Sequence, residues 1–293
     1  MILLKKVLIT GANSYVGTNV EKWFMKEPEN FYVETLEMRD PNWKNFDFSK
    51  FDVVFHVAGI VHIKETKSNK DLYYKVNRDL AIAVSEKAKR EGVKLLIFTS
   101  TMSVYGLDEG IINNSTIENP ITSYAKSKFE AEKWLLDTSD ENFKVCVIRP
   151  PMIYGPNSPG NFRKLSRFAK IIPIYPKIDN KRSSIFIYNV CKYIEYIVKN
   201  SLEGIVILKN KDDMSTIGMI ESIRKSNKKK TWFFRMPIFM LKLLLKNRAM
   251  RKIFTTLRYE TFLQIDNLYS FEESIYITEN NINVFNDEDK LYE

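Results

Sequence analysis

The feature that most constrains the fold is a regular alternation of short apolar runs with amphipathic segments of helical length. The apolar runs cover residues 4–10, 32–38, 51–59, 94–106 and 142–155, and the amphipathic segments cover 18–26, 71–92 and 123–137. Run 51–59 is apolar almost throughout, which is typical of a strand that is buried on both faces. Strands and helices that alternate in this way predict right-handed β-α-β units, and therefore an α/β fold with a doubly wound parallel sheet.

The pattern changes after about Gly155, so we predict two parts of the chain. Residues 156–293 begin with a turn-rich stretch, PNSPGN, and two strand-like runs, IIPIYP and IFIYNV, before looser helical segments. We expect a main domain over residues 1–155 and a smaller lobe over 156–293. The two are expected to be interleaved, because a strand and a helix around residues 183–200 would return to the main domain.

A turn with two glycines, VLITGANSYVGTN at residues 7–19, joins the first strand to the first helix. Gly11 permits a tight turn at the strand end, and Gly17 permits close packing of the helix on the strand. The helix N-terminus between them attracts negative charge. Ser14 stands where a glycine usually lets a pyrophosphate approach, and its hydroxyl is small enough to fit and able to donate to a phosphate. The turn alone fits a structural loop equally well, but its position favours a nucleotide site.

Tyr124 and Lys128 lie four residues apart in SYAKSK, so both side chains face the same side of the predicted helix 123–137. A nearby cation favours a phenolate, so Lys128 would lower the pKa of Tyr124 and make it a usable acid/base. The pair alone is common by chance. However, Thr101 and Ser103 end the buried run 94–106, at the sheet edge where α/β folds bind ligands. A hydroxyl there could hold a substrate oxygen while Tyr124 moves its proton.

Six segments in this order resemble the extended short-chain dehydrogenase/reductase family: TGANSYVG, HVAG, YYKVN, STMSVYG, YAKSK and RPPMIYG. The resemblance covers about residues 5–190 and is strongest to the branch of nucleotide-sugar epimerases, dehydratases and reductases, which includes UDP-glucose 4-epimerase. It implies a Rossmann-type doubly wound parallel sheet that binds NAD(P) and a smaller C-terminal lobe that binds the substrate.

The resemblance also implies roles for individual residues. Thr101 matches the catalytic serine or threonine, Tyr124 the catalytic tyrosine, and Lys128 the lysine that binds the nicotinamide ribose. The residues that would contact the cofactor are Gly11, Ser14, Tyr15, Val16, Gly17, Ala58, Gly59, Asn77, Tyr124, Lys128, and Pro150 with Pro151 beside the carboxamide. The residues that would contact the substrate, besides Thr101, are Asn161 and Arg182 at the diphosphate and Tyr175 beside the uracil. For Arg182, a solvated surface charge is the alternative interpretation.

The choice of dinucleotide depends on the segment LEMRD, residues 36–40, which overlaps the end of run 32–38. Glu37 would accept hydrogen bonds from the adenosine ribose hydroxyls and repel a 2′-phosphate, which favours NAD. The same letters also resemble a later family segment in which an acid and its apolar neighbour, here Glu37 and Met38, contact the adenine. Arg39 could instead serve a 2′-phosphate. We expect NAD, with NADP left open.

These features predict an NAD-dependent epimerase that acts at C4 of a UDP-hexose or UDP-N-acetylhexosamine, in polysaccharide precursor synthesis. The alternative is an NADPH-dependent 4-keto nucleotide-sugar reductase with the same catalytic residues. A 4,6-dehydratase is disfavoured, because those enzymes usually carry Asp-Glu after the catalytic hydroxyl and here Met102-Ser103 follow Thr101. A non-catalytic member of the fold is disfavoured by the intact Thr101, Tyr124 and Lys128.

The composition indicates which kinds of ligand and which cellular compartment to expect. The net charge of +9 favours anionic ligands. Two cysteines and two histidines form neither a disulfide framework nor a zinc site, so we expect no metal and a cytoplasmic protein. The first ten residues are interpreted as a strand and not a signal peptide, because Lys5-Lys6 interrupt the apolar run. The family includes homodimers, which nothing in the sequence tests.

Residues 226–254 are both basic and apolar. Their apolar part is too short to span a bilayer, so no transmembrane segment is expected. The favoured interpretation is a helix packed in the smaller lobe with lysines directed outward. The alternative is a helix on a membrane surface, because basic residues alternate with Phe, Leu and Met. Nucleic-acid binding is not expected, because no other basic stripe carries interleaved aromatic residues.

Overall fold

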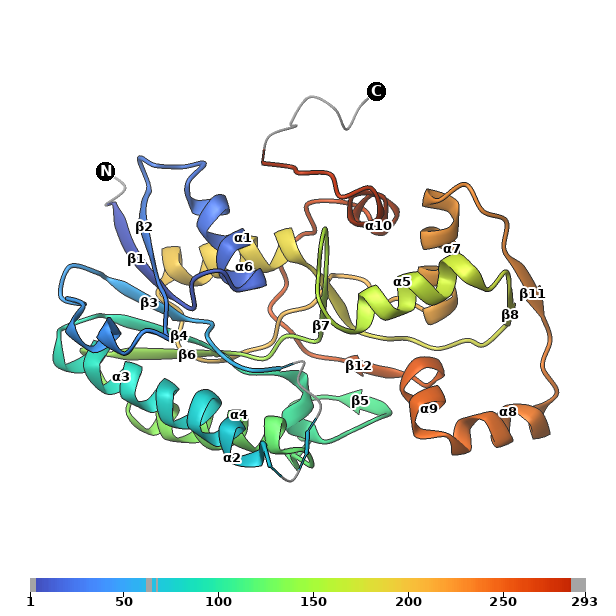
Figure 1. The fold of residues 1–293 in the computed structure, drawn as a ribbon, viewed down its shortest axis with the longest axis horizontal. Helices are drawn as coiled ribbons and strands as arrows, with labels where there is room; N and C mark the ends of the chain where they lie inside the picture. Colours follow the sequence, from blue (N-terminus) through green and yellow to red (C-terminus); the bar gives the residue numbers. More distant parts are fainter. Residues whose placement is uncertain (1–3, 62–64, 67, 286–293) are drawn as a thin grey trace. The chain divides into compact units, whose positions relative to one another are not determined.

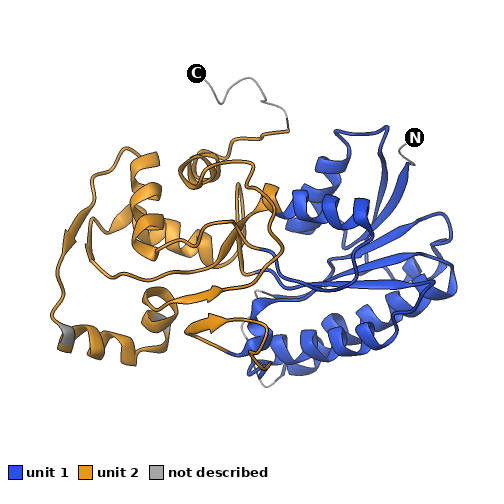
Figure 2. Cartoon of the chain, turned by 180° about the vertical axis from the view of Figure 1, so that it is seen from behind, with its two compact units in different colours: residues 1–106, 118–150, 190–208 blue, residues 107–117, 151–189, 209–293 orange. Residues whose placement is uncertain are grey.

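The structure is a computed structural model that describes residues 4–61, 65–66 and 68–285. These residues divide into two compact units. Unit 1 comprises residues 1–106, 118–150 and 190–208, and unit 2 comprises 107–117, 151–189 and 209–293 (Figure 2).

Unit 1 contains a six-stranded sheet in the order β10-β6-β4-β3-β1-β2, in which every neighbouring pair is parallel (Figure 1). The strands are β1 (Lys5–Thr10), β2 (Phe31–Leu36), β3 (Val53–His56), β4 (Leu95–Thr99), β6 (Lys144–Ile148) and β10 (Gly204–Val206). Because the chain moves outward from β1 in both directions, the sheet is doubly wound, and the predicted fold class is confirmed.

Helices cover both faces of this sheet. α1 (Tyr15–Phe24) and α6 (Ile187–Asn200) lie over one face, while α2 (Lys70–Tyr74), α3 (Leu80–Arg90) and α4 (Ser123–Asp137) lie over the other (Figure 1). A π-helical turn, η2 (Lys75–Asp79), joins α2 to α3, so the predicted helix 71–92 is continuous apart from this change of pitch. Two 3₁₀ turns, η1 (Pro41–Asn45) and η3 (Met102–Tyr105), follow β2 and β4.

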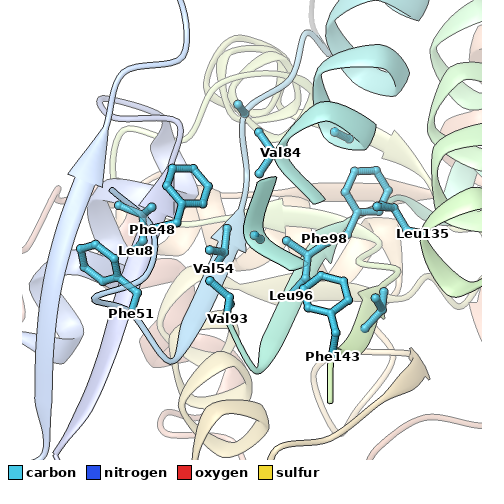
Figure 3. Packing of buried hydrophobic residues seen from close by; sticks show 14 of the residues in the cluster. Leu8, Phe48, Phe51, Val54, Val84, Val93, Leu96, Phe98, Leu135 and Phe143 are labelled. Carbon is cyan, nitrogen blue, oxygen red and sulfur yellow. The ribbon is translucent and has the colours of Figure 1, made fainter. Parts of the chain in front are cut away.

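The core of unit 1 fills the space between the sheet and the second helical layer (Figure 3). Leu96 and Phe98 of β4 point into it and meet Val84 of α3 and Leu135 of α4, all of them fully buried. Ile97, which points to the opposite face of the sheet, is buried as well. The sheet is therefore apolar on both faces, which explains why its strands appear as continuous apolar runs.

Three of the apolar runs contain strands that are shorter than the runs themselves, for local reasons. Run 94–106 leaves the strand after Thr99 and turns into η3. Run 142–155 is divided into β6 and β7 (Met152–Tyr154), because Pro150 and Pro151 have no N–H to donate to a ladder. The stretch IFIYNV is strand only in β9 (Ser184–Phe186), after which α6 begins at Ile187. A short buried apolar run does not distinguish a strand from a buried helix.

Unit 2 contains three two-stranded parallel ribbons and five helices within the described residues. β5 (Gly110–Ile112) pairs with β12 (Leu257–Tyr259), β7 with β9, and β8 (Ile174–Pro176) with β11 (Trp232–Phe234). The helices are α5 (Asn161–Ile171), α7 (Thr216–Ser226), α8 (Ile238–Lys246), α9 (Arg248–Phe254) and α10 (Phe271–Glu279). Pairing with β12 places residues 107–117 in unit 2, whereas the predicted main domain over residues 1–155 includes them.

Candidate active site

The glycine turn is held between the carboxyl ends of β2 and β3. The Leu36 carbonyl accepts hydrogen bonds from the Gly11 and Ala12 amides, at 2.9 and 3.1 Å. Gly11 has a φ of +119°, and a Cβ atom there would lie 2.8 Å from the Ala58 backbone nitrogen. Only glycine accommodates both the backbone conformation and this close approach. The turn therefore delivers the start of α1 to the carboxyl edge of the sheet.

Ser14 caps α1. Its hydroxyl oxygen accepts a hydrogen bond from the Gly17 amide at 3.1 Å, and a Cβ atom at Gly17 would lie 2.6 Å from that oxygen. The serine thus replaces a glycine of the usual pattern without blocking the turn, and its proton is still available to a phosphate. Tyr15 and Val16 form the first turn of the helix, where backbone N–H groups have no partner within the helix. These positions fit a bound pyrophosphate.

Glu37 follows β2 directly and stands beside this turn, since Leu36 is the residue that binds Gly11. Its carboxylate accepts from the Arg39 guanidinium at 2.8 and 3.1 Å, and these bonds lower the pKa of Glu37 to about 2. Glu37 is therefore an anion at neutral pH, and Arg39 is occupied by it. Met38 is buried in the core of unit 1. The position after β2 corresponds to an acid at the adenosine ribose, the first of the two interpretations of LEMRD.

Thr101 and Tyr124 meet at the start of α4. Thr101 follows β4, where its hydroxyl oxygen accepts from the Ser103 amide at 3.1 Å and so begins η3. The Thr101 side chain also interacts with the phenol of Tyr124 and lowers the pKa of that phenol. Thr122 caps α4 by accepting from the Ala125 amide at 3.2 Å, and this cap fixes the helical turn that carries the tyrosine.

Lys128 is buried one turn further along α4. Its ammonium donates to the Thr99 carbonyl at 2.8 Å and lies 4.7 Å from the centre of the Phe98 ring. Burial lowers the pKa of Lys128 to about 7, opposed by the negative charge of Glu132. A Cβ atom at Gly59 would lie 3.2 Å from the lysine nitrogen, so the glycine keeps this space open.

The expected lowering of the Tyr124 pKa by Lys128 is not found. Burial raises the pKa of Tyr124, and the interaction with the Thr101 side chain offsets part of that rise. The physical reason is that burial of the phenol outweighs the other effects, while the Lys128 ammonium is directed at the Thr99 carbonyl. In the protein without ligands, Tyr124 is therefore a neutral phenol at pH 7.

Asn77 fixes the loop that follows β3. Its side chain accepts from the Ile60 amide at 2.9 Å and donates to the Ile60 carbonyl at 3.1 Å and to Ser127 of α4 at 3.3 Å. The residue is fully buried in the π-helical turn, a feature often found at functional sites. Ala58 and Gly59 belong to the loop that Asn77 holds. The hydrogen bonds between Asn77 and Ile60 explain how the segment YYKVN holds the loop after HVAG, although the two segments are far apart in the sequence.

A buried ion pair below Lys128 was missed by the sequence analysis. Arg149, which follows β6 and precedes the two prolines, donates to Glu132 of α4 and, at 2.6 Å, to Glu118. It also donates to the Tyr105 hydroxyl at 2.7 Å. The spacing of Lys128 and Glu132, i and i+4 on one helix, was a signal for part of this network. The position of Arg149 in RPP was not, because its partners are distant in the sequence.

Apart from Thr101, the residues expected at the substrate lie in unit 2, each in different surroundings. Asn161 is exposed at the first position of α5. Tyr175 is buried in β8, and its hydroxyl donates to the Phe168 carbonyl at 3.3 Å, so little of its ring is open to a base. Arg182 is half-buried and donates to the Thr255 carbonyl at 2.9 Å, which argues against a fully solvated surface charge. Pro151 is buried at the start of the segment that leads to β7.

The chain is similar to known epimerases. The NAD dependent epimerase/dehydratase family matches residues 7–207. UDP-glucose 4-epimerase of Vibrio cholerae is 31% identical over 268 residues, which cover 82% of this chain and 81% of that protein. An N-acetyl-α-D-glucosaminyl-diphospho-ditrans,octacis-undecaprenol 4-epimerase of Escherichia coli O157:H7 is 27% identical over 252 residues, 79% of this chain and 75% of that protein. UDP-glucuronic acid 4-epimerase of Bacillus cereus, solved in complex with NAD, shares the fold, with a TM-score of 0.73 at 18% identity over 97% of this chain and 99% of that one.

Proposed function

The chain belongs to the NAD-dependent epimerase/dehydratase family, and from this premise we propose that it interconverts the C4 epimers of a UDP-sugar through a transient 4-keto intermediate. The substrate would be a UDP-hexose or a UDP-N-acetylhexosamine. The observation that carries the proposal is the placement of Thr101 next to Tyr124, one helical turn from the buried Lys128, at the carboxyl edge of a parallel sheet. This edge is where open α/β sheets bind their ligands.

The glycine turn and the start of α1 would hold the NAD pyrophosphate, Glu37 the adenosine ribose, and Lys128 the nicotinamide ribose. NAD supplies a hydride acceptor and donor. The space at Gly11 and Gly59, which a Cβ atom would fill, fits a cofactor that approaches the backbone closely.

Tyr124 and Thr101 would act on the same substrate oxygen. Tyr124 in its phenolate form would take the proton of the C4 hydroxyl as hydride leaves C4 for the cofactor, and Thr101 would hold the oxygen that becomes a carbonyl. The 4-keto sugar then turns over, hydride returns to the opposite face of C4, and Tyr124 gives the proton back to the oxygen. Asn161 and Arg182 would hold the diphosphate, so that the sugar can rotate while the UDP group stays bound.

The proposal is tested with the purified full-length chain, UDP-glucose or UDP-N-acetylglucosamine, and no added reductant. We expect the corresponding galacto-configured sugar nucleotide to accumulate to equilibrium, as followed by NMR of the sugar H4, and bound NAD to be released on denaturation. Consumption of NADPH with a 4-keto sugar nucleotide, without interconversion, would instead identify the reductase. Because one relative is named for a polyprenyl-linked substrate, a sugar on a polyprenyl diphosphate belongs among the compounds assayed.

Replacing Glu37 by Gln is expected to shift the dinucleotide preference toward NADP. The substitution removes an anion that repels a 2′-phosphate. It also frees Arg39 to bind a 2′-phosphate, because in the wild type the Arg39 guanidinium is hydrogen-bonded to the Glu37 carboxylate. We expect the ratio of the Kd values for NADP and NAD to fall about tenfold, the effect of roughly 1.4 kcal/mol, as measured by titration calorimetry. The double variant Glu37→Gln, Arg39→Gln is the control, and should lose most of the gain.

A further inference from the structure

The excess of positive over negative charge in the chain comes from two segments of unit 2. Residues 161–178 and 222–259 together contain 17 Lys and Arg residues and no Asp or Glu. The rest of the chain contains 28 basic and 36 acidic residues and is therefore net negative, although the whole chain carries +9. The two segments are paired through β8 and β11, and the Lys229 ammonium donates to the Lys170 carbonyl at 2.8 Å, so the segments lie side by side.

The same two segments expose large apolar side chains. All three residues of β11 are exposed, with Trp232 at 61%, and Ile174, its partner in β8, is exposed at 53%. On α8, Phe239 and Leu243 are 72% and 66% exposed. In monomeric proteins, large apolar residues that are exposed together mark an interaction surface. We call the exposed side chains of β8, β11 and α8 the β11–α8 surface.

Basic side chains border this surface on α8 itself. Phe239 and Leu243 lie four residues apart on one side of the helix, and Lys242 and Lys246 lie four apart next to them. Both lysines are exposed, as is Arg235 between β11 and α8. None of these three forms an ion pair with a carboxylate among the described residues. Figure 1 shows α8 at one end of the ribbon of unit 2, on the far side from α10.

We propose that the β11–α8 surface docks on the face of an anionic membrane. Tryptophan, phenylalanine and leucine would enter the boundary between headgroups and acyl chains, while the lysines and arginines contact the lipid phosphates. Within the described ranges, no helix reaches the length and apolar character needed to cross a membrane, so attachment would be at the surface only. The expected packed helix over 226–254 is replaced by β11, α8 and α9, and α8 buries none of its described side chains completely.

Charge complementarity favours a lipid surface over a second copy of the chain. A twofold interface would bring the basic border of one copy close to that of the other, and the surface has no acidic residue to pair with it. An anionic bilayer supplies both an apolar interior for Trp232 and Phe239 and negative charge at the level of the lysines. This inference does not depend on which sugar the enzyme uses.

The test is sedimentation of the full-length protein with vesicles of phosphatidylcholine alone or with about one third phosphatidylglycerol. We expect binding to the anionic vesicles only, weakened by added salt because the charges are screened. Lys242→Gln with Lys246→Gln should weaken binding by roughly 30-fold, about fivefold for each basic side chain. Phe239→Ser with Leu243→Ser should weaken it more than tenfold at constant charge. Circular dichroism checks that each variant is folded.

The matched control is Lys44→Gln with Lys94→Gln, two exposed lysines of unit 1 that give the same change in net charge. This pair should bind vesicles like the wild type. Equal loss in the control, or no binding of the wild type to either vesicle, would overturn the proposal. So would a wild-type dimer that Phe239→Ser with Leu243→Ser converts to a monomer, without vesicle binding. Turnover of a UDP-sugar without vesicles should be unchanged in every variant, so the proposed reaction and the proposed docking fail independently.

Discussion

Replacing Tyr124 by phenylalanine is expected to lower kcat by about 10²- to 10⁴-fold while leaving NAD bound. The substitution removes only the hydroxyl that moves the C4 proton, and general acid–base groups contribute rate effects of this size. The ring keeps its edge-to-face contact with Tyr73, at 6.5 Å between centroids, so the start of α4 should keep its structure. The measurements are steady-state kinetics with a UDP-sugar and the content of released cofactor.

Tyr74→Phe provides the matched control for this experiment. Tyr74 lies on α2, where its ring packs under the Arg78 guanidinium, and it is not part of the pair formed by Thr101 and Tyr124. Its variant should retain wild-type kcat. A Tyr124→Phe enzyme with more than about a tenth of the wild-type rate would show that another group moves the proton, and Thr101 would then be the residue to examine.

The pH dependence of the reaction should reflect the phenol as well. Because burial raises the pKa of Tyr124 in the ligand-free protein, its reactive phenolate form should become populated only at a higher pH than in a free tyrosine, so the rate should increase with pH. The direction of this pKa shift is opposite to the one expected from the sequence, where Lys128 alone was considered. The reason for the error is that a helix pattern places two side chains on one face but does not tell how deeply that face is buried. Desolvation, which dominates here, depends on residues of other elements that cover the phenol, such as Tyr73 of α2.

The parts of the fold that were predictable are those set by local patterns. Helix 123–137 has the predicted bounds, because its periodicity is uninterrupted and Thr122 caps it. The parallel sheet followed from the continuous apolar runs. In unit 2, the structure depends on pairing between distant segments, such as β5 with β12, for which the sequence carries no local signal. The burial of Tyr175 and the partners of Arg149 were hidden for the same reason.

Replacing Lys128 by methionine is expected to stabilise the ligand-free protein while lowering kcat/KM by at least about 100-fold. The folded-state pKa of Lys128 is about 7, against 10.5 for an unperturbed lysine. The native state therefore binds fewer protons than the unfolded state between these values, and the penalty for burying the lysine grows as pH falls from 10.5 to 7 and is constant below. At 1.36 kcal/mol per pH unit over the 3.5 units between 7 and 10.5, the penalty is on the order of 5 kcal/mol at low pH.

Methionine removes this penalty but leaves the Thr99 carbonyl without its donor, at a cost of about 1–3 kcal/mol, so we expect a net gain of about 2 kcal/mol at pH 7. Urea unfolding at pH 6, 7 and 9 measures it, and the gain should shrink toward pH 9. Lys126→Met, an exposed lysine on the same helix, should show no such trend. A Lys128→Met protein that is less stable at every pH, or that keeps its activity, would contradict the argument that a charge is buried here for catalysis. A residue that weakens the fold yet is required for turnover is expected where function opposes stability.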